Sequence, residues 1–462
     1  VVWFDNIPWG GESARFVEFL FERRESLPVL VVMTARTSDW REEEGVRRRL
    51  EEVLAEERAR RLEVEPLARR HQREFISQML KFSSETVDAL LERTEGHPLF
   101  AIQLASDWVE RDLLVASEEG FELREGAEQE IPVDLRALWN RRIDELIRRH
   151  PGERAELERA LELAAALGKQ VDELEWRCVL DEAGLEFDGD LTDGLVEAGL
   201  AERIAGGFQF VHGLLVESLE SRAREAGRGE IHHRHCALAV ARMYPEQASE
   251  TALRRAGHWL ATSVPEKALD PLLVASRRAY QHGQYDRQTE LLDRRREVME
   301  RLGLPEQARE RVENWIQRGL NEIKRGAPAD ADVSFREARR AAQKHGWREQ
   351  YAWATFGVSY AADQRGRADE AFEALDRAEE VFVELNQLPG LAKCDQHRAH
   401  VHRRLTRDYE RARELCIRAG ERFDQIGDVH GVIGSETIHC ITHLLEGDLE
   451  QAEALAEGIR EA

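Results

Sequence analysis

A repeated pattern of small residues, with the period of one helical hairpin, dominates the C-terminal third of the chain. An alanine lies five positions after a loop residue and seven positions before another small or apolar residue, in copies that begin at Gly326, Gly366, Arg407 and Gly447. The alanines recur every 40 or 41 residues, and a weaker copy begins at Gly283. Small residues at fixed helical positions let two helices approach closely, and stacked pairs bury apolar surface that one pair leaves exposed. The pattern predicts a tetratricopeptide-like α-solenoid over residues 291–462, preceded by a helical linker with the first repeat-like hairpins at residues 229–290.

The composition agrees with a mainly α protein of two to four domains. The chain has 462 residues, of which 34% are charged and only 12 are proline. Ninety acidic residues against 66 basic ones give a net charge of −24, which argues against a general nucleic-acid or anionic-membrane surface. The five cysteines form no C-x-x-C pair, as in reduced cytosolic proteins, and no apolar run has membrane-spanning length. We therefore expect a cytoplasmic protein without direct contact to nucleic acid or membrane.

The N-terminal segment has the pattern of a β-α-β unit. Residues 1–6 and 27–36 are short apolar runs, rich in β-branched residues, that stop abruptly on polar side chains. Buried parallel strands that end at a ligand crevice have this pattern. Between them, residues 12–24 carry Phe16 and Phe19 at helical spacing. The segment therefore predicts two parallel strands joined by a helix.

Two charged residues at the ends of these strands are candidate nucleotide contacts. A carboxylate fixed at a strand's C-terminal end can hold Mg²⁺ beside nucleotide phosphates, which makes Asp5 the candidate metal ligand. Arg36, at the end of the next strand, has the side chain that senses a terminal phosphate bidentately. The alternative stays open that Asp5 simply ends a strand and that Arg36 pairs with Asp5 or Asp39 at the sheet edge.

The middle of the chain alternates helices with short turns. A run at residues 62–67, stopped by a proline, predicts a last edge strand. Gly96-His97-Pro98 forms a turn, and Pro98 suits a helix start because its missing N–H would be unpaired there anyway. Helices are predicted at residues 69–80, at residues 84–94 with Ser84 as the N-cap, and from the turn through Leu114.

Residues 131–228 have the outline of a winged helix. Gly206-Gly207 lies between two short apolar runs within residues 199–212, which predicts a β-hairpin. Helical patterns precede this hairpin, and another helix follows it at residues 214–224. The preceding helices are predicted at residues 134–149, 152–167, 171–183 and 191–198.

Together these segments resemble the STAND class of signalling ATPases, the bacterial relatives of the apoptotic and plant-resistance NB-ARC proteins. Residues 1–6 are similar to their Walker B strand, and Met33-Thr34-Ala35-Arg36 is similar to their sensor-one segment. Gly96-His97-Pro98 resembles the G-x-P turn whose proline packs against adenine. Val211-His212-Gly213-Leu214 resembles the segment whose histidine reaches the diphosphate of bound ADP. The order and separation of the four segments agree with the class over residues 1–290.

The resemblance implies a domain order and a set of nucleotide-binding residues. Residues 1–67 would be the C-terminal part of an α/β P-loop NTPase domain from Walker B onward, followed by a helical lid at 68–130 and a winged helix at 131–228. The implied cofactors are ATP or ADP with Mg²⁺. The implied site residues are Asp5, Asn6 and Arg36 for catalysis, Thr34, Gly96, Pro98 and His212 for nucleotide binding, and Asp5 for the metal.

The resemblance also implies a switch mechanism. ADP would hold the winged helix closed through His212, and a protein or small-molecule effector on the repeats would favour an open, ATP-bound state that self-associates. The output would come from a separate domain, such as a serine/threonine kinase or a DNA-binding domain. Two other functions stay open: a nucleotide-independent repeat scaffold for protein–protein interaction, and a transcription activator whose DNA-binding module lies outside this chain.

Three departures from the class limit what the chain is expected to do. The phosphate-binding motif G-x-x-x-x-G-K-[ST] is absent, and Leu167-Gly168-Lys169-Gln170 is its nearest match. Since Val1 begins directly on a strand, we expect an N-terminally truncated fragment that binds nucleotide poorly by itself. Asn6 stands where many ATPases have a carboxylate that orients the attacking water, so hydrolysis would be slow. Gly213 replaces the aspartate that follows the histidine in the plant and animal relatives.

Other residues invite functional interpretations that we weigh against structural ones. Neighbouring residues on one helix point apart, so the His232–Cys236 stretch is a poor zinc site despite its ligand types. His212 is either a nucleotide contact or a packed junction residue, and the Gly96-His97-Pro98 turn is either an adenine contact or a simple helix–helix turn. Aromatic residues at helical spacing are expected to form solenoid core rather than a ligand site. These are Trp315, Trp347, Trp353 and Phe356.

Overall fold

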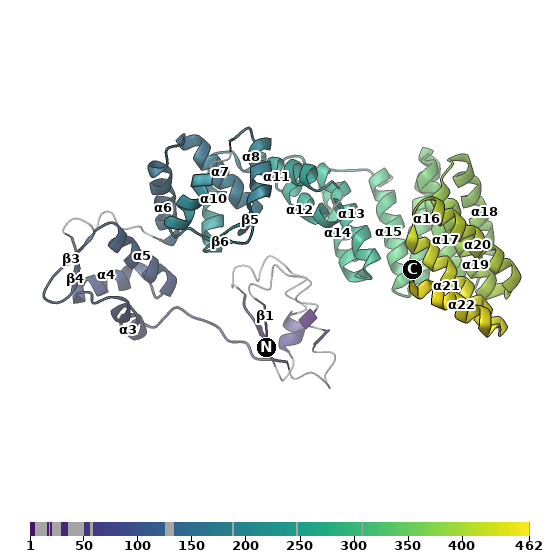
Figure 1. The fold of residues 1–462 in the computed structure, drawn as a ribbon, viewed down its shortest axis with the longest axis horizontal. Coiled ribbons are helices and arrows are strands. Elements are labelled where there is room, and N and C mark those ends of the chain that lie inside the picture. The colour runs from purple at the N-terminus through teal and green to yellow at the C-terminus, as the bar shows by residue number, and fades with distance from the viewer. Residues whose placement is uncertain are drawn as a thin grey trace. The chain divides into compact units, whose positions relative to one another are not determined.

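The computed structural model describes residues 1–4, 16–17, 19–20, 29–35, 50–55, 59–124, 134–186, 189–245, 248–306 and 308–461 (Figure 1). These residues are mainly helical, as the sequence predicts. The chain divides into two compact units, Val1–Leu146 and Ile147–Ala462. Within the described ranges, no helix combines the length and apolarity needed to cross a membrane.

The N-terminal strands pair as the sequence predicts. Strand β1 (Val2–Phe4) lies parallel to β2 (Val31–Met33), and the amide of Thr34 donates to the carbonyl of Phe4 at 2.9 Å. Residues 16, 17, 19 and 20 are helical. The apolar face differs from the prediction, because Val17 is fully buried whereas Phe16 and Phe19 are 46% and 43% exposed. Val17 packs in a small cluster with the two strands.

The rest of the first unit corrects three expectations. Residues 59–68 form no strand, and Val64 is 97% exposed, so the predicted edge strand at 62–67 is wrong. The helix predicted to run through Leu114 ends earlier, because Asp112 adopts the left-handed conformation at φ 52° and a β-hairpin follows. The N-cap of the second helix is Ser83, whose hydroxyl accepts from the amide of Thr86. The elements are α3 (Arg69–Met79), α4 (Ser84–Thr94), α5 (Pro98–Glu110), β3 (Leu114–Ala116) and β4 (Phe121–Leu123).

A three-stranded antiparallel sheet is packed among helices at the start of the second unit. The strand order is β5-β7-β6. Phe208 and Phe210 of β7 are fully buried, as is Trp176 of α8. Val171 lies in β5 rather than in the helix predicted from residue 171, because β5 pairs with β7. A side chain at Gly207 would overlap the carbonyl of Val171, so only glycine permits this pairing. Helix α6 (Leu135–Arg149) spans the boundary between the two units. The elements that follow are α7 (Arg154–Leu167), β5 (Gln170–Asp172), α8 (Glu173–Glu182), α9 (Gly189–Glu197), β6 (Ala201–Ile204), β7 (Gly207–Phe210) and α10 (Gly213–Glu225).

Stacked helical hairpins form the remainder of the second unit (Figure 1). The repeat alanines Ala331, Ala371 and Ala412 are fully buried where the two helices of a hairpin meet, which confirms the solenoid prediction. The four aromatic residues at helical spacing pack in its core clusters. The helices are α11 (Gly229–Met243), α12 (Ala248–Leu260), α13 (Leu269–Gln281), α14 (Tyr285–Arg301), α15 (Arg309–Lys324), α16 (Pro328–His345), α17 (Arg348–Gln364), α18 (Ala368–Glu384), α19 (Leu388–Val401), α20 (Tyr409–Gln425), α21 (Val429–Glu446) and α22 (Leu449–Glu461).

The first residue of each repeat copy follows the first helix of its hairpin and adopts the left-handed conformation. Gly326, Gly366 and Gly447 have φ of 77°, 75° and 86°, and Arg407 has φ of 57° at the equivalent position. Glycine adopts this conformation without steric cost, whereas arginine does not. Arg407 follows a single π-helical turn, η5 (His402–Thr406), so this hairpin closes differently from its neighbours.

Ring-on-glycine contacts between successive hairpins generate the first testable prediction. The ring of Phe335 in α16 lies against Gly319 of α15 and Gly357 of α17, and a methyl group at Gly357 would overlap it. We expect Gly357→Ala to destabilise the repeats by about 1–3 kcal/mol, because close-packed cores do not absorb extra volume.

Gly420→Ala is the matched control, since a methyl group there meets no atom within 4 Å and the residue also lies in a helix, α20. This variant should be neutral or more stable by up to ~1 kcal/mol. Thermal and urea midpoints followed by circular dichroism measure both. Equal midpoints for the two variants would contradict the packing.

Candidate functional site

Three of the seven predicted nucleotide-site residues, Asp5, Asn6 and Arg36, lie outside the described residues. Thr34 follows directly on β2, and its hydrogen bond to Phe4 places it at the C-terminal ends of both parallel strands. In α/β sheets, ligand crevices lie at this end of the strands. The position of Thr34 is therefore consistent with the predicted role, which stays a prediction.

The turn at Gly96 and Pro98 has a clear structural role. Gly96 has φ of 83°, its carbonyl accepts from the amide of Leu67 at 3.0 Å, and a side chain there would approach the Leu67 backbone. Pro98 is the first residue of α5, as predicted, and His97 Nδ1 accepts from the amide of Phe100 at 3.2 Å to cap the helix. The turn thus requires glycine at position 96 and favours proline at position 98, and an adenine contact stays a prediction.

His212 occupies the N-cap position of α10, between β7 and the helix. Burial lowers the pKa of His212, the charge of Lys169 lowers it further, and Glu202 opposes both. The imidazole is therefore neutral near pH 7 and can donate or accept a hydrogen bond. His212 belongs to the unit Ile147–Ala462, whereas Thr34, Gly96 and Pro98 belong to Val1–Leu146.

A buried ionic cluster that local sequence patterns did not reveal joins α7 to the start of α11. Glu162 is 1% exposed and receives hydrogen bonds from Arg228 Nε at 2.9 Å and Nη2 at 2.6 Å, and His232 Nε2 lies 2.8 Å from its Oε2. Burial alone would raise the pKa of Glu162, but the hydrogen bonds from Arg228 and His232 outweigh it and lower the pKa. The only local signal is a glutamate within the apolar run Leu161 to Ala165.

A second carboxylate makes a similar link from α8 to α12. Glu175 accepts from Arg254 Nη1 at 3.1 Å, pairs with the other terminal nitrogen of the same guanidinium, and accepts from Tyr244 Oη at 3.2 Å. The two carboxylates lie on α7 and α8, and their partners lie at or beyond the start of α11. The sheet-bearing module is therefore bound to the first helices of the hairpin array by buried charge pairs.

The His232–Cys236 stretch is structural. His232 is bonded to Glu162, and His233 Nδ1 lies 3.2 Å from His258 Nδ1. Cys236 is fully buried, and burial raises the pKa of its thiol to about 12, so it carries no thiolate near pH 7. Among the residues that the structure describes, no group of three or more His, Cys, Asp and Glu side chains can hold a metal ion.

A cavity of about 500 Å³ opens beside the Glu162 cluster. Its walls come from the C-terminal part of α7, the C-terminal half of α10 and the first turns of α11. Glu220 and Arg224 contribute from α10, and Glu230 and His232 contribute from α11. This cavity lies in the same unit as His212, at the other end of α10.

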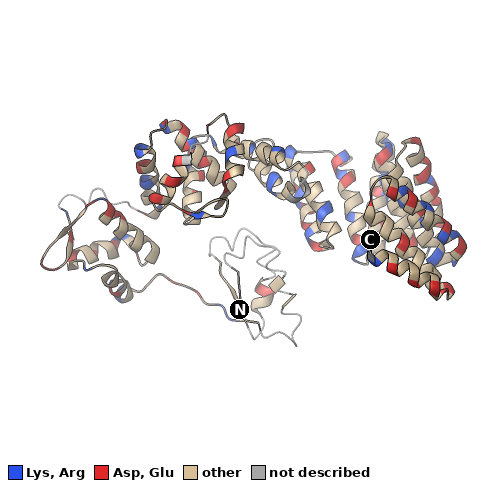
Figure 2. Ribbon diagram, in the orientation of Figure 1, with Lys and Arg blue, Asp and Glu red and all other residues tan. Residues whose placement is uncertain are grey.

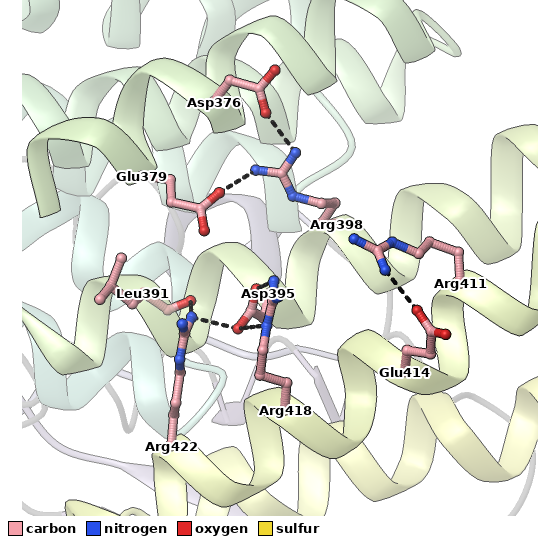
Figure 3. A network of polar contacts seen from close by, with 9 residues as sticks. All are labelled: Asp376, Glu379, Leu391, Asp395, Arg398, Arg411, Glu414, Arg418 and Arg422. Carbon is pink, nitrogen blue, oxygen red and sulfur yellow. Dashed lines mark hydrogen bonds and ion pairs between the residues drawn. The ribbon is translucent and has the colours of Figure 1, made fainter. Parts of the chain in front are cut away.

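Charge pairs also fix the register of the hairpins (Figure 3). Arg398 of α19 reaches Asp376 and Glu379 of α18, at 2.6 Å each. Asp395, three residues earlier in α19 and fully buried, is held by Arg418 and Arg422 of α20. Helix α19 is thus tied to the helices on both sides.

A second buried aspartate lies in helix α17. Asp363 of α17 is fully buried and pairs with Arg404 of the π-helical turn, with Arg404 Nε 3.1 Å from its Oδ1. Beside it, His397 stacks on Tyr360 at 3.9 Å, and burial lowers the pKa of His397 to about 4. Both signs of charge occur along the repeat helices (Figure 2). These contacts hold the array together without defining one ligand chemistry on its surface.

Comparison with known proteins identifies no family. No family model and no curated protein matches the chain. Among solved structures, the STAND protein with a tetratricopeptide repeat sensor from Pyrococcus horikoshii is similar at 12% identity and a TM-score of 0.34, over 93% of this chain and 69% of that one. Aspartyl phosphate phosphatase F from Bacillus subtilis has 12% identity and a TM-score of 0.40, over 70% of this chain and 93% of that one. BtubC from P. vanneervenii has 14% identity and a TM-score of 0.35, over 52% of this chain and 89% of that one. Likenesses this remote carry no functional conclusion.

The Glu162 cluster generates a prediction about pH. Glu162→Gln keeps the side-chain shape and removes the charge, so at pH 7 the free energy of unfolding should fall by about 1–3 kcal/mol. The folded pKa of Glu162 lies below its unfolded value. Its stabilisation is therefore present above the unfolded pKa and is lost as pH falls through the folded pKa. The difference between variant and wild type should shrink from pH 7 to about pH 3, measured by urea unfolding.

Glu373→Gln is the control, because Glu373 pairs with Arg377 in the open at 3.4 Å and is 70% exposed. It should change stability by less than about 0.5 kcal/mol. A pH-independent effect of Glu162→Gln would show that the lost contact is not ionic.

Proposed function

We propose that the chain is the effector-binding part of a nucleotide-dependent switch of the STAND type. The observation that carries the proposal is the buried ionic connection between the module that bears His212 and the helical hairpins. A switch needs a sensor whose state reaches the nucleotide site, and the Glu162 and Glu175 pairs fix the start of the hairpin array to α7 and α8. An effector that reorients α11 and α12 must therefore move the module that bears His212.

The element order supports the proposed winged helix. Helix α7 is followed by β5, then by α8 and α9, and then by the antiparallel pair β6 and β7. The sequence predicts helices followed by a β-hairpin, and β5, which it does not predict, extends that hairpin to a three-stranded sheet. His212 then follows β7 directly.

The residues around His212 suit the phosphates of ADP. Helix α10 has 13 residues and no acidic residue in its first turn, so the partial positive charge of its N-terminal amides is not offset there. A neutral imidazole at the N-cap can donate to a phosphate oxygen. In this proposal His212 binds the diphosphate, Gly96 and Pro98 contact adenine, and Asp5 holds Mg²⁺. Thr34 and Arg36 contact the terminal phosphate, and Asn6 makes hydrolysis slow.

Effector binding would then shift the balance between a closed ADP state and an open ATP state. Shifting such an equilibrium from 1:99 to 99:1 takes about 5.5 kcal/mol of differential binding. An extended array of helical hairpins can supply this differential binding energy, because many weak contacts along it add up. The effector in this proposal is a protein or a small molecule, and the open state associates with itself to control a separate output domain.

A nucleotide-independent scaffold is the second candidate function. It is favoured by one specific observation, the absence of G-x-x-x-x-G-K-[ST] from all 462 residues. In that case the helical hairpins bind a protein partner regardless of nucleotide, and His212 is a packed junction residue. Nucleotide release distinguishes the two functions.

His212→Ala should speed release of fluorescent ADP from the natural protein by about tenfold or more, the effect of losing one hydrogen bond to a charged group. His282→Ala is the control, because His282 is an exposed histidine at the end of α13 in the same unit. Stopped-flow fluorescence measures both rates. Unchanged release from His212→Ala, or no ADP binding at all, would favour the scaffold.

A further inference from the structure

The cavity between α7, α10 and α11 contains hydrogen-bond acceptors that the protein itself does not use. Glu220 of α10 lines it and makes no hydrogen bond or ion pair with any described residue. Burial raises the pKa of Glu220, and the attraction of Arg224, four residues later, does not compensate. The carboxylate of Glu220 therefore has no ion-pair partner among the described residues.

His232 contributes a buried polar atom without a hydrogen-bond partner beside the cavity. It is 2% exposed, and its Nδ1 is buried without a hydrogen-bond partner. Because the ionised carboxylate of Glu162 can only accept, His232 Nε2 carries the proton in the contact between them. Buried polar atoms are normally paired with a hydrogen-bond partner.

The charged residues of the cavity wall are mostly acidic. Arg228 neutralises the charge of Glu162. Among the other charged residues of the wall, the two carboxylates of Glu220 and Glu230 outnumber the one guanidinium, that of Arg224. One oxygen of Glu230 accepts from the amide of Ser263 at 3.2 Å, and the other is not engaged by a described residue. The walls therefore present spare acceptors and an excess of negative charge.

A compact metal ion does not suit these walls, because the described residues contain no group arranged to hold one. The volume of about 500 Å³ instead falls within the size range of small-molecule pockets. A primary ammonium group carries one positive charge and three donors, which matches the spare acceptors. We propose that this cavity binds a small organic molecule through a primary ammonium group, with Glu220 as its main ionic partner.

The site has a direct route to His212. Helix α10 begins at Gly213, next to His212, and contributes Glu220 and Arg224 to the cavity. A ligand that bridges α10 and α11 would hold the two helices together at the ionic junction. This regulatory consequence rests on the proposed function, whereas binding of the amine does not.

Putrescine, a four-carbon diamine, is the probe, and 1,4-butanediol is its uncharged match. Isothermal titration of the 462-residue chain should show saturable binding of putrescine and none of the diol. Glu220→Gln should weaken putrescine binding roughly tenfold or more, because a hydrogen-bonded ionic contact is lost. Ala261→Phe, which fills the cavity from an exposed position on its rim, should do the same without changing charge.

Glu373→Gln controls for the change in net charge and should bind like the wild type. Equal binding of the diol, no effect of Glu220→Gln in a folded variant, or no saturation by putrescine up to about 10 mM would overturn the proposal. The two experiments have separate readouts and therefore separate the two proposals. Putrescine binding, together with a rate of ADP release that His212→Ala leaves unchanged, would retain the cavity site and contradict the proposed switch.

Discussion

Two buried carboxylates hold the second unit of this protein together. Glu162 and Glu175 lie on neighbouring helices of the sheet-bearing module, and each is satisfied only by side chains of the segment that leads into the hairpins. Removing charges from water costs several kcal/mol per ion, which only good geometry and further hydrogen bonds repay. The module and the first hairpin helices are therefore interdependent, since neither segment alone satisfies these groups.

Beyond this junction, the array is held by a different interaction, the close approach of aromatic rings to glycine and alanine. The Phe335 ring lies against glycines of the helices before and after it, and Phe382 and Phe423 lie against Gly390 and Gly431 in the same manner. Such contacts fix distance and tilt between hairpins, because any added atom overlaps a ring. Ionic pairs around α19 then fix the register along the helix axes.

Among the four copies of the repeat motif, the copy between α19 and α20 is irregular. Three copies of the repeat motif begin with glycine, and the fourth begins with Arg407 after a π-helical turn. That turn places Arg404 on Asp363, two helices earlier. π-Helical turns often occur at functional positions, because the extra residue redirects side chains. Here the side chain of Arg404 pairs with one oxygen of a buried carboxylate in α17, Asp363 Oδ1.

The sequence by itself determined the features whose signals are local or periodic. Helix class, the 40-residue period, the hairpin at Gly206-Gly207 and the parallel pairing of the first two strands all follow from residue spacing. Local patterns failed where a distant partner decides the conformation. Val171 extends as a strand because β7 pairs with it, and the run at residues 62–67 stays unpaired because no strand of the described chain lies beside it.

The nucleotide residues inferred from resemblance, Asp5, Asn6 and Arg36 among them, stay predictions. Only the tertiary structure decided the junction and its cavity. Glu162 meets Arg228 across 66 residues, and Glu175 meets Arg254 across 79. Helical periodicity assigns a glutamate to a helix but does not choose its partner. The choice depends on which helices pack together, and that depends on the burial of apolar surface along the whole chain.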